Sequence, residues 1–203
     1  KLAAKYNIQV KTMMPGHEWT EADLEGVTMV IAPSPLKRGN SVTPGGVPTA
    51  YGDTFIQLMN KFVNDGGTLV VNGLADYQDS SLPYTTYEQA LRLLSGVGST
   101  MKIHDDELID NELNGGQNYR LYFNKFNLGS GDAYVEDILT GVDASDKNGS
   151  YSSYSGASVD PGNGTPVVFG HDSTYSINSR TPNQGHDVPV TSASVEHTED
   201  QMV

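Results

Sequence analysis

The chain has 203 residues, no cysteine, and 25 Asp and Glu against 12 Lys and Arg, which gives a formal net charge of -13 at pH 7. This length suits one domain, and the lack of cysteine excludes a thiol nucleophile, a thiolate metal site and a disulfide framework. Because the charge is negative and no apolar run approaches the roughly 20 residues of a membrane span, we expect neither nucleic-acid binding by this domain alone nor membrane insertion.

The beginning of the chain predicts the end of a helix followed by a strand. Residues 2–6 have a helical composition, and Ile8 and Val10 alternate as they do on one face of a strand. Because the chain opens with Lys1 and not with a methionine or a signal peptide, we expect a piece of a longer protein. Whether it begins inside a βα unit, and so lacks its first strand, stays open.

A short helix and a buried strand are predicted next. Thr20 can cap a helix that carries acidic residues in its first turn, and Gly26 can end it. Residues 27–32 are almost continuously apolar, which is typical of a strand buried on both faces of a parallel sheet. Residues 36–50 hold three glycines and two prolines, and they predict a surface loop that could act as a lid.

An amphipathic helix and a second buried strand follow. Five apolar residues share one helical face, and Gly66 and Gly67 end the helix. These five residues are Phe55, Leu58, Met59, Phe62 and Val63. Residues 68–73 predict the next buried strand, and Thr85 with Glu88 forms the capping box of a further helix.

The second half of the chain has a different pattern. Short alternating strands after Met101 indicate an irregular or antiparallel insertion. Residues 141–164 consist mostly of small and polar residues and predict a long loop. Residues 166–170 predict a last buried strand, and the polar residues after 182 predict a tail.

Together these elements predict a flavodoxin-like α/β fold, which is an open, doubly wound, mostly parallel sheet with helices on both faces and an irregular or antiparallel insertion in the second half. We expect residues 27–32, 68–73 and 166–170 to lie in one parallel sheet. Residues 1–182 are predicted to form a single α/β domain, and residues 183–203 a polar tail or a linker to a further domain.

Polar side chains that could carry catalysis follow three of the predicted strands. Ligands of doubly wound sheets bind outside the carboxyl ends of the strands. His171 would act there as a general base, and Asp172 or Asp76 would orient it. Ser34 or Ser173 would supply a hydroxyl. The alternative is that these side chains only cap turns.

The same edge of the sheet is the predicted ligand site. Lys37 and Arg38, in the loop that could cover it, would offset its acidity when a polar or anionic group enters. The candidate ligand-binding residues are Ser34, Lys37, Arg38, Asp76, Tyr77 and His171. The alternative is that the loop docks against an adjacent domain.

One acidic stretch could bind a metal ion. Asp105, Asp106 and Glu107 offer the hard oxygen ligands that Ca²⁺ and Mg²⁺ prefer. Their spacing matches no standard calcium loop, so a solvated acidic loop is the alternative. The sequence also lacks the short motifs of nucleotide-binding loops, serine hydrolases and zinc proteases, and we expect no cofactor.

Two stretches, residues 27–35 and 55–77, follow the pattern of a strand, a long loop, a helix and F-V-x-x-G-G-x-L-V-V-x-G. This pattern resembles the class I glutamine amidotransferase-like superfamily, especially its non-catalytic GIFT-like branch in bacterial extracellular multidomain proteins. Residues 165–176 resemble a later strand and turn of that branch. Catalytic members carry a cysteine nucleophile on an elbow where Ala75 stands here, so the resemblance implies the scaffold without amidotransferase activity.

Three functions remain as hypotheses. The resemblance implies a non-catalytic accessory domain, for binding or spacing, in a secreted or surface protein whose other domains are its partners. The strand-end residues favour a hydrolase of phosphoesterase or nuclease type. The many tyrosines of the second half favour a carbohydrate-binding module for a glycan or a small polar ligand.

Overall fold

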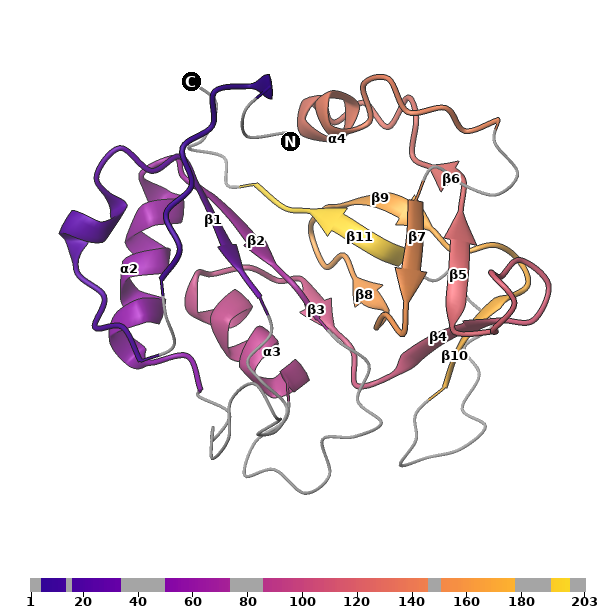
Figure 1. The fold of residues 1–203 in the computed structure, drawn as a ribbon, viewed down its shortest axis with the longest axis horizontal. Coiled ribbons are helices and arrows are strands. Elements are labelled where there is room, and N and C mark those ends of the chain that lie inside the picture. Colours follow the sequence, from indigo (N-terminus) through magenta and orange to yellow (C-terminus); the bar gives the residue numbers. More distant parts are fainter. Residues whose placement is uncertain are drawn as a thin grey trace.

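The computed structural model describes residues 5–13, 16–33, 50–73, 86–145, 151–177 and 191–197, in two halves that differ in architecture (Figure 1). The first half contains η1 (Glu21–Leu24), β1 (Met29–Ala32), α2 (Asp53–Asn64), β2 (Thr68–Val71) and α3 (Thr86–Gly96). The second half contains β3 (Lys102–Ile103), β4 (Glu107–Asp110), β5 (Arg120–Phe123), β6 (Lys125–Phe126), α4 (Ala133–Ile138), β7 (Tyr151–Tyr154), β8 (Val159–Asp160), β9 (Thr165–Phe169), β10 (Thr174–Ile177) and β11 (Thr191–Val195). The protein is a mixed α/β fold in which short strands outnumber helices among the described residues.

The first half contains the strand pair and the helix that the sequence predicts. β1 and β2 are parallel, with Met29 opposite Thr68 and Ala32 opposite Val71. The buried side of α2 packs against the side of this pair that carries Val30 and Ala32. The buried residues of α2 are Phe55, Ile56, Met59 and Phe62. The two predicted strands, their parallel pairing and the amphipathic helix are confirmed. The prediction that residues 27–32 are buried on both faces is wrong, because β1 is covered on one face only, and β2 is at most half-buried.

Two glycines make the turn between α2 and β2. Gly66 has a φ of +94°, in the left-handed region that favours glycine, and the Gly67 N–H donates to the Phe62 carbonyl at 2.8 Å. A Cβ at Gly67 would lie 2.4 Å from the Phe62 ring. The glycine pair is therefore required both by the backbone conformation of the turn and by the packing of the Phe62 ring.

The second half is built around a five-stranded sheet with the order β3-β8-β11-β9-β6, in which all neighbouring strands are antiparallel. The prediction that residues 166–170 join the parallel sheet is wrong. Val167 and Val168 are both buried because β9 lies between β11 and β6 and packs into the second-half core. A continuous apolar run indicates that both faces of a strand are covered, but it does not indicate the direction of the neighbouring strands.

Two segments expected to be irregular form strands. β7 lies within the predicted loop 141–164 and pairs antiparallel with β5, while β8 pairs with β3 and β11. The loop prediction is wrong for these residues, because strands that pair with distant segments need little apolar surface of their own. Residues 191–195, inside the expected tail, form β11 in the five-stranded sheet.

The amino-terminal segment also differs from its prediction. Residues 8–13 form no strand, and Ile8 and Val10 are 55 % and 72 % exposed. Alternation of two apolar residues supplies no hydrogen-bonding neighbour, and a strand requires one. The predicted short helix does form as η1, where Thr20 and Asp23 complete a capping box. The lid loop 36–50 lies outside the described residues except for its last residue, as does Thr85 of the second capping box.

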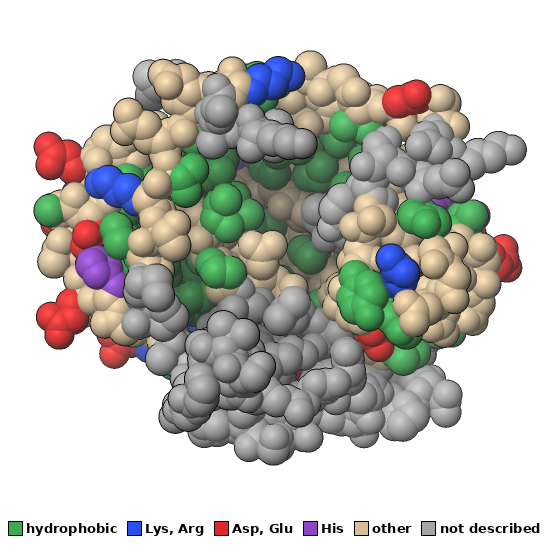
Figure 2. Space-filling model, in the orientation of Figure 1, with side chains coloured by type: hydrophobic (Ala, Val, Ile, Leu, Met, Phe, Trp, Pro, Cys, Tyr) green, Lys and Arg blue, Asp and Glu red, His purple; other side chains and the backbone are tan. Residues whose placement is uncertain are grey.

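The face drawn in Figure 2 is hollowed near its centre, and hydrophobic side chains line part of the hollow. On β1, Met29 and Ile31 lie on the side of the strand opposite the buried Val30 and Ala32, and they are 53 % and 63 % exposed.

In the part of the chain that the structure describes, no helix is both long enough and apolar enough to cross a membrane.

Candidate functional site

The predicted strand-end site is described only in part. Ser34, Lys37, Arg38, Asp76 and Tyr77 lie outside the described residues, as does Ala75. His171 and Asp172 lie in the turn between β9 and β10. The carboxylate of Asp172 is 99 % exposed and pairs with Lys125 Nζ at 2.6 Å. The described remainder of the site is therefore the surface around the β9–β10 turn.

His171 lines a polar depression of about 400 Å³. The residues that line it are Glu112, Leu113, Lys125, His171, Asp172 and Ser173. The pKa of His171 is lowered mainly by burial of the ring and, to a smaller extent, by the positive charge of Lys125. The charges of Asp110 and Asp172 and a hydrogen bond with the Tyr122 backbone oppose this shift. The neutral form of the imidazole is therefore favoured, and His171 is a weaker base than a free histidine.

Asp110 lies beside this depression and is fully buried. Its Oδ1 accepts the backbone N–H groups of Glu112 and Leu113, both at 2.8 Å. Its Oδ2 accepts the hydroxyls of Ser173 and Thr174, both at 2.9 Å. Burial alone would raise the pKa of Asp110, but these four donors outweigh it and lower the pKa. A carboxylate held this acidic is a poor base for Ser173, so the network joins β4 to the β9–β10 turn instead of activating a nucleophile.

The candidate metal ligands do not converge. Asp106 is buried, and its two oxygens accept the Ser158 N–H at 2.7 Å and the Ser158 hydroxyl at 2.5 Å. Glu107 belongs to strand β4, and Asp105 precedes the buried Asp106. Within the described residues, no three His, Asp or Glu side chains form a group that could hold a metal ion. Both oxygens of Asp106 are already engaged by protein donors.

A Ser-His-Asp set does occur around Asp106, but in an order unsuited to catalysis. His104 Nδ1 lies 2.7 Å from the Ser158 hydroxyl, and that hydroxyl donates to Asp106. In a nucleophilic triad the imidazole lies between the serine and the carboxylate and takes the serine proton. Here the serine lies in the middle and is buried, so this chain of hydrogen bonds fastens β8 to the β3–β4 connection.

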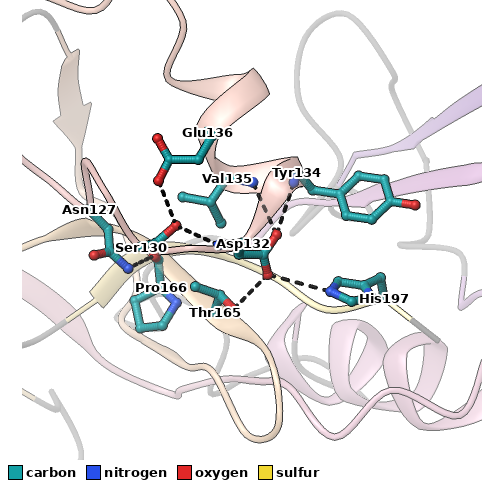
Figure 3. Close-up of polar contacts among 9 residues, drawn as sticks. All are labelled: Asn127, Ser130, Asp132, Tyr134, Val135, Glu136, Thr165, Pro166 and His197. Atoms are coloured by element: carbon teal, nitrogen blue, oxygen red, sulfur yellow. Dashed lines mark hydrogen bonds and ion pairs between the residues drawn. The ribbon is translucent and has the colours of Figure 1, made fainter. Parts of the chain in front are cut away.

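A third carboxylate network was missed by the sequence analysis (Figure 3). Asp132 caps α4, where its Oδ1 accepts the N–H groups of Tyr134 at 2.9 Å and Val135 at 3.3 Å. Its Oδ2 accepts the Thr165 hydroxyl at 2.7 Å and lies 3.5 Å from His197 Nε2. Burial opposes ionisation, but the Thr165 and backbone hydrogen bonds lower the pKa of Asp132. An Asp directly before a helix is a common cap, and this was the available sequence signal.

Glu196 forms the last of these networks, directly after β11. Its carboxylate accepts the hydroxyls of Ser99 at 2.5 Å and Thr100 at 2.7 Å, and the N–H groups of Thr100 at 2.8 Å and Met101 at 3.2 Å. Burial opposes ionisation, but these hydrogen bonds lower the pKa of Glu196. We call Asp106, Asp110, Asp132 and Glu196 the four carboxylate ties.

A comparison with known protein families, curated proteins and solved structures finds no match for this chain. The resemblance to the amidotransferase-like superfamily therefore stays a prediction.

Proposed function

We propose that this chain is a non-catalytic accessory domain, used for binding or spacing, of a larger secreted or surface protein. We further propose that its first half belongs to a flavodoxin-like, amidotransferase-like scaffold. The main support for this proposal is that four acidic side chains act as hydrogen-bond acceptors for other groups of the protein. The four carboxylate ties each accept two to four hydrogen bonds from protein donors. Three of them join segments of the second half, and Glu196 joins β11 to the connection between α3 and β3.

A hydrolase needs a base that can take a proton and a hydroxyl or water within its reach. The hydroxyls of Ser158 and Ser173 instead donate to Asp106 and Asp110. The pKa of Asp110 is lowered, which makes it a weaker base. With no cysteine in the sequence, the chain also has no thiol for an amidotransferase reaction.

The experiment is a hydrolysis assay on the pure chain with bis(4-nitrophenyl) phosphate, with and without Mg²⁺ or Ca²⁺. We expect the wild type and a folded His171→Gln variant to release nitrophenol at the same background rate. A rate above background that is lost in His171→Gln, and retained in a Glu112→Gln control at the same depression, would show that the domain is a hydrolase.

One observation favours the hydrolase as the second candidate. His171 and Lys125 line the same open polar depression, where an imidazole and an ammonium could act as base and anion-binding group. The ion pair between Lys125 and the highly exposed Asp172 opposes this function, because it neutralises the ammonium. The same assay decides between the two candidates.

A further inference from the structure

A groove of about 620 Å³ lies between η1 and the carboxyl-terminal end of α2, away from the β9–β10 turn. Its floor is apolar, since Phe62 is buried and Leu24, Val27 and Leu58 are half-buried. Its rim is charged and exposed. The rim residues are Glu21, Glu25, Lys61 and Asp65.

The rim is negative even though it contains a lysine. Three carboxylates face one ammonium, and Lys61 Nζ pairs with Asp65 Oδ2 at 2.9 Å. The pKa of Lys61 is raised mainly by this hydrogen bond, then by the charge of Asp65, and least by the charge of Glu21. The carboxyl-terminal end of a helix carries a partial negative charge, so the end of α2 adds to the negative potential of the groove.

Both walls of the groove are fixed by local hydrogen bonds. On the η1 side, Asp23 Oδ2 accepts the Thr20 N–H at 2.8 Å and lies 3.1 Å from His17 Nε2. On the α2 side, the Gly66 N–H donates to the Val63 carbonyl at 3.0 Å in the turn that ends the helix. A partner would therefore bind without reordering the walls, and this preserves affinity.

We propose that this groove docks a basic amphipathic segment of a partner protein. The apolar side chains of the segment would cover Leu24, Leu58 and Phe62, and its Lys or Arg side chains would pair with Glu21 and Glu25. Charge complementarity selects this occupant, because an acidic segment would be repelled by the rim and a small cation would leave the apolar floor exposed to water. The inference rests on the proposed role as an accessory binding domain.

The test is an NMR titration of the ¹⁵N-labelled chain with two 14-residue peptides of helical spacing. One consists of Leu and Lys, and the other has Glu at every Lys position. We expect the Lys peptide to shift the amides of Leu24, Val27 and Gly66 and to bind at least about tenfold more tightly than the Glu peptide, with the difference shrinking as salt is added.

Two double variants test whether the acidic rim residues cause the tighter binding of the Lys peptide. Glu21→Gln with Glu25→Gln should weaken binding of the Lys peptide about tenfold. Glu112→Gln with Asp137→Asn removes the same charge outside the groove and should weaken it less than twofold. Thermal melts establish that both variants are folded.

Equal binding of the two peptides, shifts centred outside the groove, no binding, or equal weakening by the two double variants would each overturn the docking proposal. The titration does not depend on turnover, and the phosphodiester assay does not depend on the groove. Failure of the docking site and failure of the accessory role are therefore separate results.

Discussion

The two halves of the molecule are stabilised in different ways. In the first half α2 packs on the parallel pair β1–β2, and the core around Met59 and Leu93 is made of apolar side chains. The second half also has an apolar core, which includes Phe123, but its buried carboxylates, Asp106 and Asp110, are the only ones in the described part of the chain.

The difference follows from the size of the elements. α2 has 12 residues and presents a continuous apolar side, whereas the strands of the second half have two to five residues each. Each of these short strands presents only a few side chains to the core, so polar contacts also help to hold their connections. The carboxylate ties supply such contacts across long separations in sequence, such as the separation of 64 positions from Asp110 to Thr174. Among the acidic residues that suggested a metal site, Asp106 is the one that the structure places in such a tie.

Among the single substitutions considered, the largest loss of stability is expected in the first half. Met59 is fully buried in the α2 core, and Met59→Ala should lower the free energy of unfolding by about 3 kcal/mol because it removes packing and leaves a cavity. Urea unfolding followed by circular dichroism measures this loss. Leu58→Ala, on the same helix but half-buried, should cost clearly less. An equal cost at both positions would contradict the assignment of the core.

A smaller loss is expected when a carboxylate tie is altered in the second half. Asp110→Asn keeps the size of the side chain but turns an amide toward two of its four donors, so we expect a loss of about 2 kcal/mol by urea unfolding. Asp172→Asn, whose side chain is 99 % exposed, is the control and should leave the urea midpoint unchanged. If the two variants behave alike, Asp110 does not hold the second half together.

The next largest loss of stability is expected when a single hydrogen-bond donor is removed. Thr165→Val removes the hydroxyl that donates to Asp132 and should lower the free energy of unfolding by about 1 kcal/mol. Thr165→Ser keeps the hydroxyl and should lose less in the same urea experiment. If Ser were no better than Val, packing of the Thr165 methyl group, and not the hydrogen bond, would account for the loss.

The smallest expected effect is a pH dependence near neutrality. The pKa of His171 is lowered in the folded state, so the unfolded state binds a proton first as the pH falls below about 6.5. Stability should therefore decline slightly between pH 7 and the lower folded pKa. His171→Gln should remove this decline, as measured by melting temperature at each pH. An unchanged pH profile in the variant would mean that another group is responsible.

The first half was largely predictable because its signals are local. The helical spacing of Phe55, Met59 and Phe62 and the apolar runs at 27–32 and 68–73 each fit within a short window of sequence. The direction of β9 and the strands β7 and β11 depend on partners elsewhere in the chain, and no local pattern reports those partners. This is why residues 166–170 were placed in the wrong sheet.

The sequence predicted where the candidate site residues lie along the chain, but not which side chains contact each other there. The sequence indicates that His171 and Asp172 follow a strand, but the Lys125 partner of Asp172 lies 47 residues away. The capping role of Asp132 could have been predicted from its position before a helix, whereas the contact of Asp106 with Ser158 spans 52 residues. Side-chain partners at such separations are set by the tertiary fold.

The central claim is that the carboxylate ties stabilise the second half. The pKa values of Asp110, Asp132 and Glu196 are lowered in the folded state, so as the pH falls below about 5 the unfolded state binds protons first and the stability from these groups is lost. Residue-resolved hydrogen exchange at pH 7 and pH 3, corrected for intrinsic rates, tests this directly. We predict that β4, β10 and α4 lose protection at pH 3 while α2, β1 and β2 keep most of theirs. Equal loss in both halves, or loss confined to the first half, would contradict the claim.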